Sequence, residues 1–166
     1  MYKRQREVGS SDIAYVQVEA VLAQCDLFLN EGAALQEKTQ KAQKSWAQKE
    51  QNLQAEAAQL QEKYQKGLIT TNDAQAQQQS IEKRVASYQS SAQKEAQALD
   101  EENYVFTNRA QDLLHRAVQE INGDKKYKLI INATALIDAD STLNITPAVL
   151  AKVNELYAAD KKAVKK

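Results

Sequence analysis

Two side chains in this sequence are of the kinds that most often act as nucleophile or base. The chain of 166 residues contains a single histidine, His115, and a single cysteine, Cys25. A catalytic histidine needs a nucleophile and an orienting group beside it, and His115 lies off the predicted apolar seam, so we expect it to be solvated. Cys25 lies in a mostly apolar helical stretch with Val21, Leu22 and Leu27, so we expect its thiol to pack rather than react. One histidine and one cysteine cannot form a Cys/His zinc site.

Acidic clusters and glycines supply no other chemistry. The segment from Asp138 to Asn144 is similar to a calcium-binding loop, but Leu143 stands where the loop needs glycine and Val149 where it needs glutamate. The carboxylates at 100–102 lie along one predicted, solvated helix. The four glycines are too far apart to build a phosphate-binding loop. We therefore predict a protein that is not an enzyme and has no metal site and no cofactor.

The composition excludes further classes of protein. Lysine plus arginine and aspartate plus glutamate both number 22, so the net charge is zero and the basic excess typical of nucleic-acid binders is missing. No run of 18 apolar residues exists, so no membrane-spanning helix is expected. The polar start at 1–11 lacks the apolar segment that a signal peptide contains. With four glycines and one proline, helix breakers are scarce. Long helices are therefore expected.

A long helix is predicted from Leu29 to Lys66. From Leu35 onward, apolar positions recur with a period near 3.5, which is typical of a coiled coil. This first seam consists of Leu35, Thr39, Ala42, Trp46, Lys49, Leu53, Ala57, Leu60 and Tyr64. Gly67 stands where a left-handed residue ends a helix, and Thr70 with Asp73 resembles a capping box. A tight turn is therefore expected over 67–72.

A second helix is predicted from Thr71 to Asn122. Its seam consists of Ile81, Val85, Tyr88, Ala92, Glu95, Leu99, Glu102, Phe106, Arg109 and Leu113, continued by Ala117 and Ile121. Two such helices joined by a short turn must be antiparallel. Polar residues interrupt both seams, so we expect an arm that holds together but bends. We assign residues 29–122 to this helical-hairpin arm.

The remaining segments predict a small body. Strands are expected at Ile13–Val18 and Tyr127–Asn132, with shorter extended candidates at 136–139 and 143–145. A last helix starts at Thr146-Pro147, with threonine as its N-cap. The body comprises residues 12–28 and 123–158, between flexible ends at 1–11 and 159–166. Even with these polar ends included, the body has only about 70 residues, and a core that small is marginal alone. This favours self-association through Ile13, Tyr15, Val16, Val18, Leu129, Ile130, Ile131, Leu136 and Ile137.

The order of these segments resembles the Skp (OmpH-like) family of periplasmic chaperones. The resemblance rests on Asp12-Ile13-Ala14-Tyr15-Val16, on the two-helix arm, on Tyr127-Lys128-Leu129-Ile130-Ile131 and on the run from Leu143 to Asn154 that opens the last helix. It covers about residues 12 to 157. It implies an α+β fold in which a small β-rich trimerisation body carries a long antiparallel two-helix coiled-coil arm, inserted between its strands.

The resemblance also implies a function. Family members are homotrimers that hold unfolded outer-membrane proteins in a cavity between their arms, in the periplasm and without ATP. The expected partners are therefore such clients and further copies of the chain, and clients or a removed N-terminal segment could bring the protein to a membrane. The family's best-known members are strongly basic, whereas residues 36–94 here carry nine basic and six acidic side chains. This difference suggests less electrostatic and more apolar capture of clients.

Two interpretations of the arm's apolar side chains stay open. They either contact client or seal the two helices together, and this applies to Trp46, Leu53, Leu60, Tyr64, Ile81, Val85 and Tyr88, with Leu68 and Ile69 at the turn. For the whole protein, the alternative to a holdase chaperone is a structural coiled-coil adaptor that binds one defined partner in the cell envelope. An enzyme of unrecognised type would instead lose activity on changing His115 or Cys25.

Overall fold

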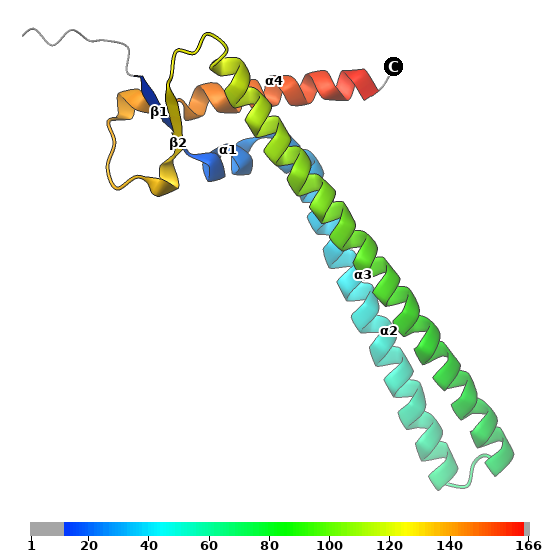
Figure 1. Cartoon of the computed structure of the whole chain (residues 1–166). Coiled ribbons are helices and arrows are strands. Elements are labelled where there is room, and N and C mark those ends of the chain that lie inside the picture. Colours follow the sequence, from blue (N-terminus) through cyan, green and yellow to red (C-terminus); the bar gives the residue numbers. More distant parts are fainter. Residues whose placement is uncertain (1–11, 165–166) are drawn as a thin grey trace, which may run out of the picture. The chain divides into compact units, whose positions relative to one another are not determined.

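The computed structural model describes residues 12–164, so the flexible end predicted at 1–11 lies outside the described residues. The main elements are β1 (Ile13–Val16), α1 (Val18–Gln24), α2 (Ala33–Gln65), α3 (Thr71–Ile121), β2 (Leu129–Asn132) and α4 (Thr146–Val164) (Figure 1). They divide into two compact units. The body unit holds the described residues up to Ala33 and from Val105 onward, and the arm unit is Ala34–Tyr104.

The sheet of the body unit joins the two ends of the chain. β1 pairs with β2 in parallel, with Ile13 opposite Leu129 and Val16 opposite Asn132. On the other side of β1, Tyr15 forms an isolated bridge with Asn144. Parallel pairing needs a long crossover, and here all of α1, α2 and α3 lie between the two strands in the sequence. The predicted insertion of helices between strands is therefore confirmed.

The body unit is less rich in β-structure than the sequence predicts. β1 ends at Val16, and Val18 already belongs to α1. β2 begins only at Leu129. The extended candidates at 136–139 and 143–145 are not strands, because short 3-10 turns at Ala133–Ala135 and Ser141–Leu143 curl this segment. In both turns an Asn or Asp side chain accepts a hydrogen bond from a backbone N–H two residues on, which competes with strand pairing.

The core of the body unit draws on every helix of that unit. α4 contributes Val149, Val153, Leu156 and Tyr157, whose spacing of three and four residues places them on one face. They pack with other buried residues from α1, the segment after it and α3, namely Val21, Cys25, Leu27, Ala110, Leu113 and Ala117. The predicted apolar face of the last helix and the buried position of Cys25 are therefore confirmed.

The start of α4 is capped differently from the prediction. The first helical hydrogen bond runs from the Val149 N–H to the Ile145 carbonyl, and the Asn144 side chain accepts from the Thr146 N–H at 2.9 Å. The Thr146 hydroxyl does not cap its own helix, because it accepts a hydrogen bond from the Gln17 N–H. α4 also continues through Val164, although the sequence predicts a flexible tail from residue 159 onward.

The helical path after β1 is interrupted twice. Cys25 has a ψ of 149°, which ends α1, and a π-turn follows at Phe28–Gly32. The Phe28 ring meets the Phe106 ring edge-on, with centroids 4.8 Å apart. Glu31 accepts hydrogen bonds from Arg109 at 2.6 Å and from the Tyr157 hydroxyl at 3.0 Å. The π-turn is thus held by both α3 and α4.

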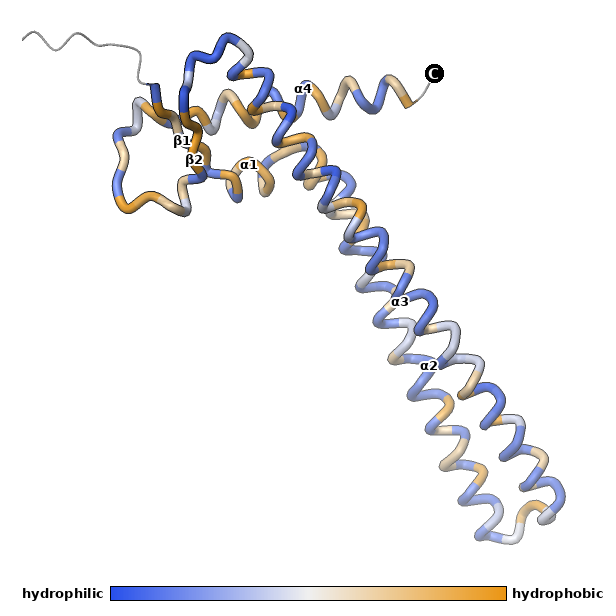
Figure 2. Tube along the Cα trace, in the orientation of Figure 1, coloured by the Kyte–Doolittle hydropathy of each residue, from blue (hydrophilic) through white to orange (hydrophobic). Residues whose placement is uncertain are grey.

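The arm unit is an antiparallel pair of helices. Contacts between α2 and α3 join Lys38 to Glu102, Trp46 to Glu95 and Glu56 to Arg84, so the residue number falls on one helix as it rises on the other. The bounds of α2 and α3 agree with the predicted helices to within a few residues. Figure 2 shows that both helices are mainly hydrophilic, with apolar positions at intervals.

The turn at the end of the arm has the predicted form. Gly67 has a φ of 68°, the Leu68 N–H donates to the Lys63 carbonyl and the Gly67 N–H donates to the Tyr64 carbonyl. These two bonds define a Schellman motif. The Thr70 hydroxyl accepts from the Asp73 N–H at 3.1 Å and donates to its carboxylate at 2.7 Å. The chain therefore reverses with its helix ends satisfied.

Candidate functional site

Most of the arm residues proposed to contact client lie in the contact between the two helices. Leu60 and Ile81 are buried. Five others are half-buried, namely Trp46, Leu53, Ile69, Val85 and Tyr88. Tyr64 and Leu68 are exposed, with relative accessibilities of 45% and 69%. Of the side chains proposed for client contact, the most exposed therefore lie near the turn, while Tyr104, the last residue of the arm unit, is a further exposed ring at 69%.

Polar side chains form hydrogen bonds between the two helices in the middle of the arm. The Trp46 indole N–H donates to Glu95 at 2.7 Å, and the Tyr88 hydroxyl donates to the Trp46 carbonyl at 3.1 Å. Tryptophan and tyrosine bring both apolar area and a polar group. Glu95, which interrupts the predicted seam, thus has a partner on the facing helix. This arrangement ties α2 to α3 without a continuous apolar zipper.

Exposed ion pairs between the helices add little to the stability of the arm. Lys38 pairs with Glu102, and Arg84 lies 2.5 Å from Glu56. The hydrogen bond from the Arg84 guanidinium lowers the pKa of the Glu56 carboxyl below its ordinary value. All four side chains are well exposed to solvent, where such pairs contribute little to stability. They are consistent with the antiparallel register of the helices but contribute little to holding them together.

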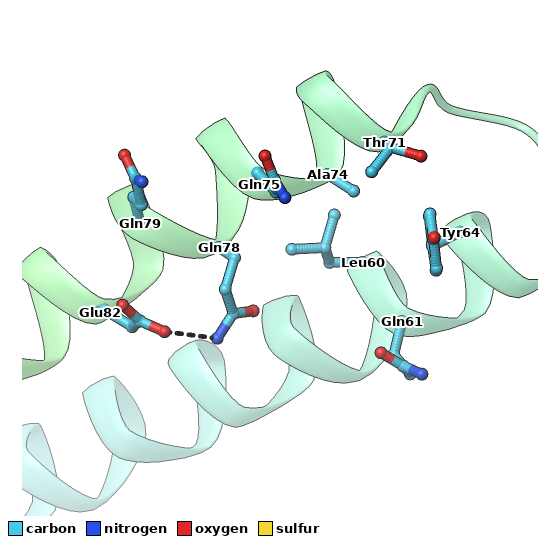
Figure 3. Close-up of a pocket in the computed structure, with 9 residues that line it drawn as sticks. All are labelled: Leu60, Gln61, Tyr64, Thr71, Ala74, Gln75, Gln78, Gln79 and Glu82. Carbon is cyan, nitrogen blue, oxygen red and sulfur yellow. Dashed lines mark hydrogen bonds between the residues drawn. The ribbon is translucent and has the colours of Figure 1, made fainter.

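A groove lies next to the turn of the arm. It has a volume of about 590 Å³. Its lining comes from both helices and consists of Leu60, Gln61, Tyr64, Thr71, Ala74, Gln75, Gln78, Gln79 and Glu82. Figure 3 shows Leu60 directed from α2 towards Ala74 of α3, with amide side chains spaced along α3. Of the residues that the sequence analysis proposes for client contact, Leu60 and Tyr64 belong to this groove.

The glutamines of the groove were missed by sequence reasoning. Glutamine is a good helix former and carries no charge, so in a helical pattern it is read as neutral surface. One signal was available in the sequence. Gln77-Gln78-Gln79 is a run of three glutamines that follows the predicted turn by a few residues. Only the pairing of the two helices places part of this run beside Leu60 and Tyr64.

Most of the residues proposed for self-association belong to the two-stranded sheet of the body unit, and the others follow its strands in the sequence. Ile13 and Leu129, which are opposite each other in the sheet, are exposed at 45% and 51%. Ile137 is fully exposed on the loop after β2, whereas Val16 is buried in the core of its own chain. The other five are half-buried, namely Tyr15, Val18, Ile130, Ile131 and Leu136. Figure 2 shows both strands as strongly hydrophobic.

A second hollow lies on the body unit. Its volume is about 390 Å³, and its lining includes Val16, Val18, Leu114, Val118 and Ile131. Among the described residues the sheet consists of β1 and β2 alone, so β2 has no neighbouring strand on its other side. An apolar hollow beside an open strand edge is a surface suited to pairing with another chain.

Of the two side chains considered for catalysis, His115 lines the second hollow, whereas Cys25 belongs to the core of the body unit. His115 is exposed, and its Nε2 lies 3.0 Å from the side-chain nitrogen of Gln119. The Cys25 thiol is fully buried and donates to the Leu22 carbonyl at 3.3 Å. Within residues 12–164 no cluster of three or more histidine, cysteine, aspartate or glutamate side chains is placed to hold a metal ion.

A helix that crosses a membrane must be both long and apolar. Of the helices that the structure describes, none is both long enough and apolar enough to span a bilayer. α3 has 51 residues, so its length would suffice, but charged and amide side chains recur along it.

The chain is similar to known proteins over most of its length. A family model described as outer membrane protein (OmpH-like) matches residues 12–153. The crystal structure of a candidate outer membrane chaperone (OmpH-like) from Caulobacter crescentus CB15 superposes with a TM-score of 0.74 at 15% identity, covering 93% of this chain and 90% of that chain. At this identity the superposition concerns the fold. No curated protein matches this chain.

Proposed function

Since the chain belongs to the OmpH-like family of outer membrane proteins, we propose that it is an ATP-independent holdase chaperone. Three copies associate through their body units, and the arms of this trimer hold unfolded outer-membrane proteins in the space between them. Binding keeps the sticky segments of one client away from those of another. The protein acts in the periplasm, where these clients pass on their way to the outer membrane.

The observation that carries this proposal is how the arm uses its apolar side chains. Leu60, Ile81 and Leu99 are buried in the contact between α2 and α3. What remains for a client is a largely hydrophilic surface with a few exposed apolar groups, such as Leu68 at the turn and Tyr104 at the last residue of the arm unit. Contacts of this kind are weak and do not select a sequence. Several arms acting on one client convert weak contacts into useful affinity.

The body unit supports self-association. Its sheet has two strands of four residues, and a sheet of that size is marginal by itself. The exposed side chains of Ile13, Leu129 and Ile137 are apolar and lie around this sheet. Burying them against other copies would stabilise the body by roughly 25 cal/mol for each Å² of apolar surface removed from water. In a trimer, β2 would also gain a neighbour.

The deciding experiment is the mass of the protein in solution, measured by light scattering with and without an unfolded β-barrel client. We expect a trimer alone and a complex of one trimer with client. Ile130→Asp and Ile131→Asp should each dissociate the trimer, because a carboxylate in an apolar interface is costly to desolvate. A stable monomer from the unmodified chain would exclude the cavity.

A second experiment separates the two units. Replacing residues 40–93 by a short flexible connector should leave the body trimeric but abolish protection of the client against aggregation. If this shortened chain protects client as well as the full chain does, client binding lies outside the arm. An adaptor, by contrast, would bind one folded partner tightly and would not slow aggregation of unrelated unfolded proteins.

A further inference from the structure

The groove beside the arm turn is lined by several glutamine side chains. The ligand inferred for it below rests on the proposed function. Of the 21 glutamines in the chain, 16 lie between residues 34 and 104. Four of these, Gln61, Gln75, Gln78 and Gln79, line the groove. We call it the glutamine groove. Its apolar part is supplied by Leu60, Ala74 and the half-exposed ring of Tyr64.

Three of the four amides have no partner within the described chain. Gln78 donates to Glu82 at 2.9 Å, which is the hydrogen bond drawn in Figure 3. The side chains of Gln61, Gln75 and Gln79 form no hydrogen bond with residues 12–164. Each offers one acceptor oxygen and two N–H donors. The groove therefore has free amides from both helices at its rim, next to an apolar centre between the helices.

The groove carries almost no charge. Its single ionisable group at neutral pH is the Glu82 carboxylate, and that carboxylate accepts the bond from Gln78. No lysine or arginine lines it. Phosphate groups and lipid headgroups are bound through cations, so this lining does not suit them. An uncharged, amide-rich ligand matches it best.

We propose that the glutamine groove binds an extended segment of unfolded polypeptide through its backbone. A peptide unit has one N–H donor and one carbonyl acceptor, and a glutamine amide can pair with both. An extended segment directs alternate side chains to opposite faces. One apolar side chain of the segment can therefore enter the centre formed by Leu60, Ala74 and Tyr64 while its neighbours point to solvent.

This mode of binding explains how the arm accepts many clients. Backbone groups are the same in every sequence, so recognition through them requires no particular side chains. Each hydrogen bond to a flexible chain in water contributes little net free energy, so a single groove binds weakly and releases readily. Because backbone groups are uncharged and the groove carries a single carboxylate, its affinity for them should be nearly independent of ionic strength.

The test uses two short synthetic peptides labelled with a fluorophore. Both are uncharged and alternate valine with serine, but in one of them alternate backbone nitrogens are methylated and cannot donate hydrogen bonds. Fluorescence anisotropy is measured while the full-length protein is titrated. We expect the methylated peptide to bind about tenfold more weakly, and we expect affinities that do not change with added salt. Equal affinities, or no binding of either peptide, would overturn the proposal.

A pair of triple variants locates the binding. Gln61→Ala, Gln75→Ala and Gln79→Ala together remove the free amides and should weaken binding of the unmethylated peptide by about tenfold. The control changes Gln51, Gln89 and Gln93 to alanine, which repeats the spacing of four on α3 outside the groove. The control should bind like the unmodified chain. Alanine raises helix propensity at exposed positions, so both variants should fold.

The outcomes distinguish this inference from the proposed function. If the groove variant loses peptide binding but the control does not, the proposal stands. If both keep it while the unmodified chain protects a full-length β-barrel client from aggregation, the holdase function stands and the groove is not its binding site. If the groove variant changes only the oligomeric mass, the groove contacts a second copy of the chain and the proposal is wrong. Failure of the unmodified chain to protect any client would overturn the proposed function itself.

Discussion

The backbone N–H of Gln17 donates a hydrogen bond to the hydroxyl of Thr146 at 2.9 Å, although 129 residues separate the two. A similar bond runs from the Asp26 N–H to the Asn154 side chain, also at 2.9 Å. In each case an α4 side chain satisfies an N–H group near one end of α1, a helix whose N-cap residue makes no side-chain cap of its own. Side chains of α4 thus supply partners that the N-terminal segment lacks locally.

Thr146→Val should therefore destabilise the body unit. Valine keeps the shape of threonine but cannot accept the Gln17 hydrogen bond. We expect the free energy of unfolding to fall by about 1 kcal/mol, measured by urea denaturation of the full chain. Thr134→Val is a matched control, because the Thr134 hydroxyl forms no hydrogen bond with any residue that the structure describes. Equal losses for both variants would show that the bond to Gln17 contributes nothing.

Gly67→Ala should weaken the arm turn through the backbone alone. The φ of Gly67 is 68°, and a Cβ atom added there would meet no atom within 4 Å. The cost is therefore that of a left-handed backbone in an L-residue, about 1 kcal/mol. Gly67→Asn should cost less, because asparagine tolerates this conformation. Trp46, the only tryptophan, reports the unfolding of the arm by fluorescence. A neutral effect of alanine would contradict the Schellman geometry.

Substitutions at Gly32 and Phe106 should have coupled effects on the free energy of unfolding. A Cβ atom at Gly32 would lie 3.0 Å from Cζ of Phe106, too close for the ring to stay in place. Gly32→Ala should therefore lower the free energy of unfolding by about 1 kcal/mol. In a Phe106→Leu background the contact is absent, and the same substitution should be neutral or stabilising because alanine favours the helix. A double-mutant cycle by thermal denaturation measures the coupling, and additive effects would refute it.

Asp160 should contribute stability that depends on pH. Arg116 donates two hydrogen bonds to it, at 2.9 and 3.1 Å, and these lower the pKa of the Asp160 carboxyl below its ordinary value near 3.8. A carboxyl with a lowered folded-state pKa stabilises the protein above its unfolded pKa. That contribution is lost as the pH falls through the folded pKa.

The variant Asp160→Asn tests this. Because 43% of the Asp160 side chain is exposed, screening by solvent limits the loss at neutral pH to under about 1 kcal/mol. The difference from the unmodified chain should vanish as the pH falls below about 3.8. Urea denaturation across this range measures it. A difference that stays constant with pH would show that packing, and not charge, is responsible.

Features that depend on neighbours in the sequence were predictable. The Schellman turn at Gly67 and the capping by Thr70 follow from spacings of three to six residues, and the structure confirms them. The apolar members of the seams of α2 and α3 were predictable in the same way, and all of them except Tyr64 are buried or half-buried. The polar seam residues were predictable as interruptions. Their partners were not, because the bond from Trp46 to Glu95 depends on the register of two helices.

Features that join distant segments were decided only by the tertiary structure. The sequence by itself determined a two-helix arm between two strand-forming ends, because helical periodicity and turn residues act locally. It did not determine the parallel pairing of β1 with β2, the hydrogen bond from the Gln17 N–H to the Thr146 hydroxyl or the glutamine groove. Each of these brings together groups whose individual preferences are weak. Their meeting depends on the path of the whole chain.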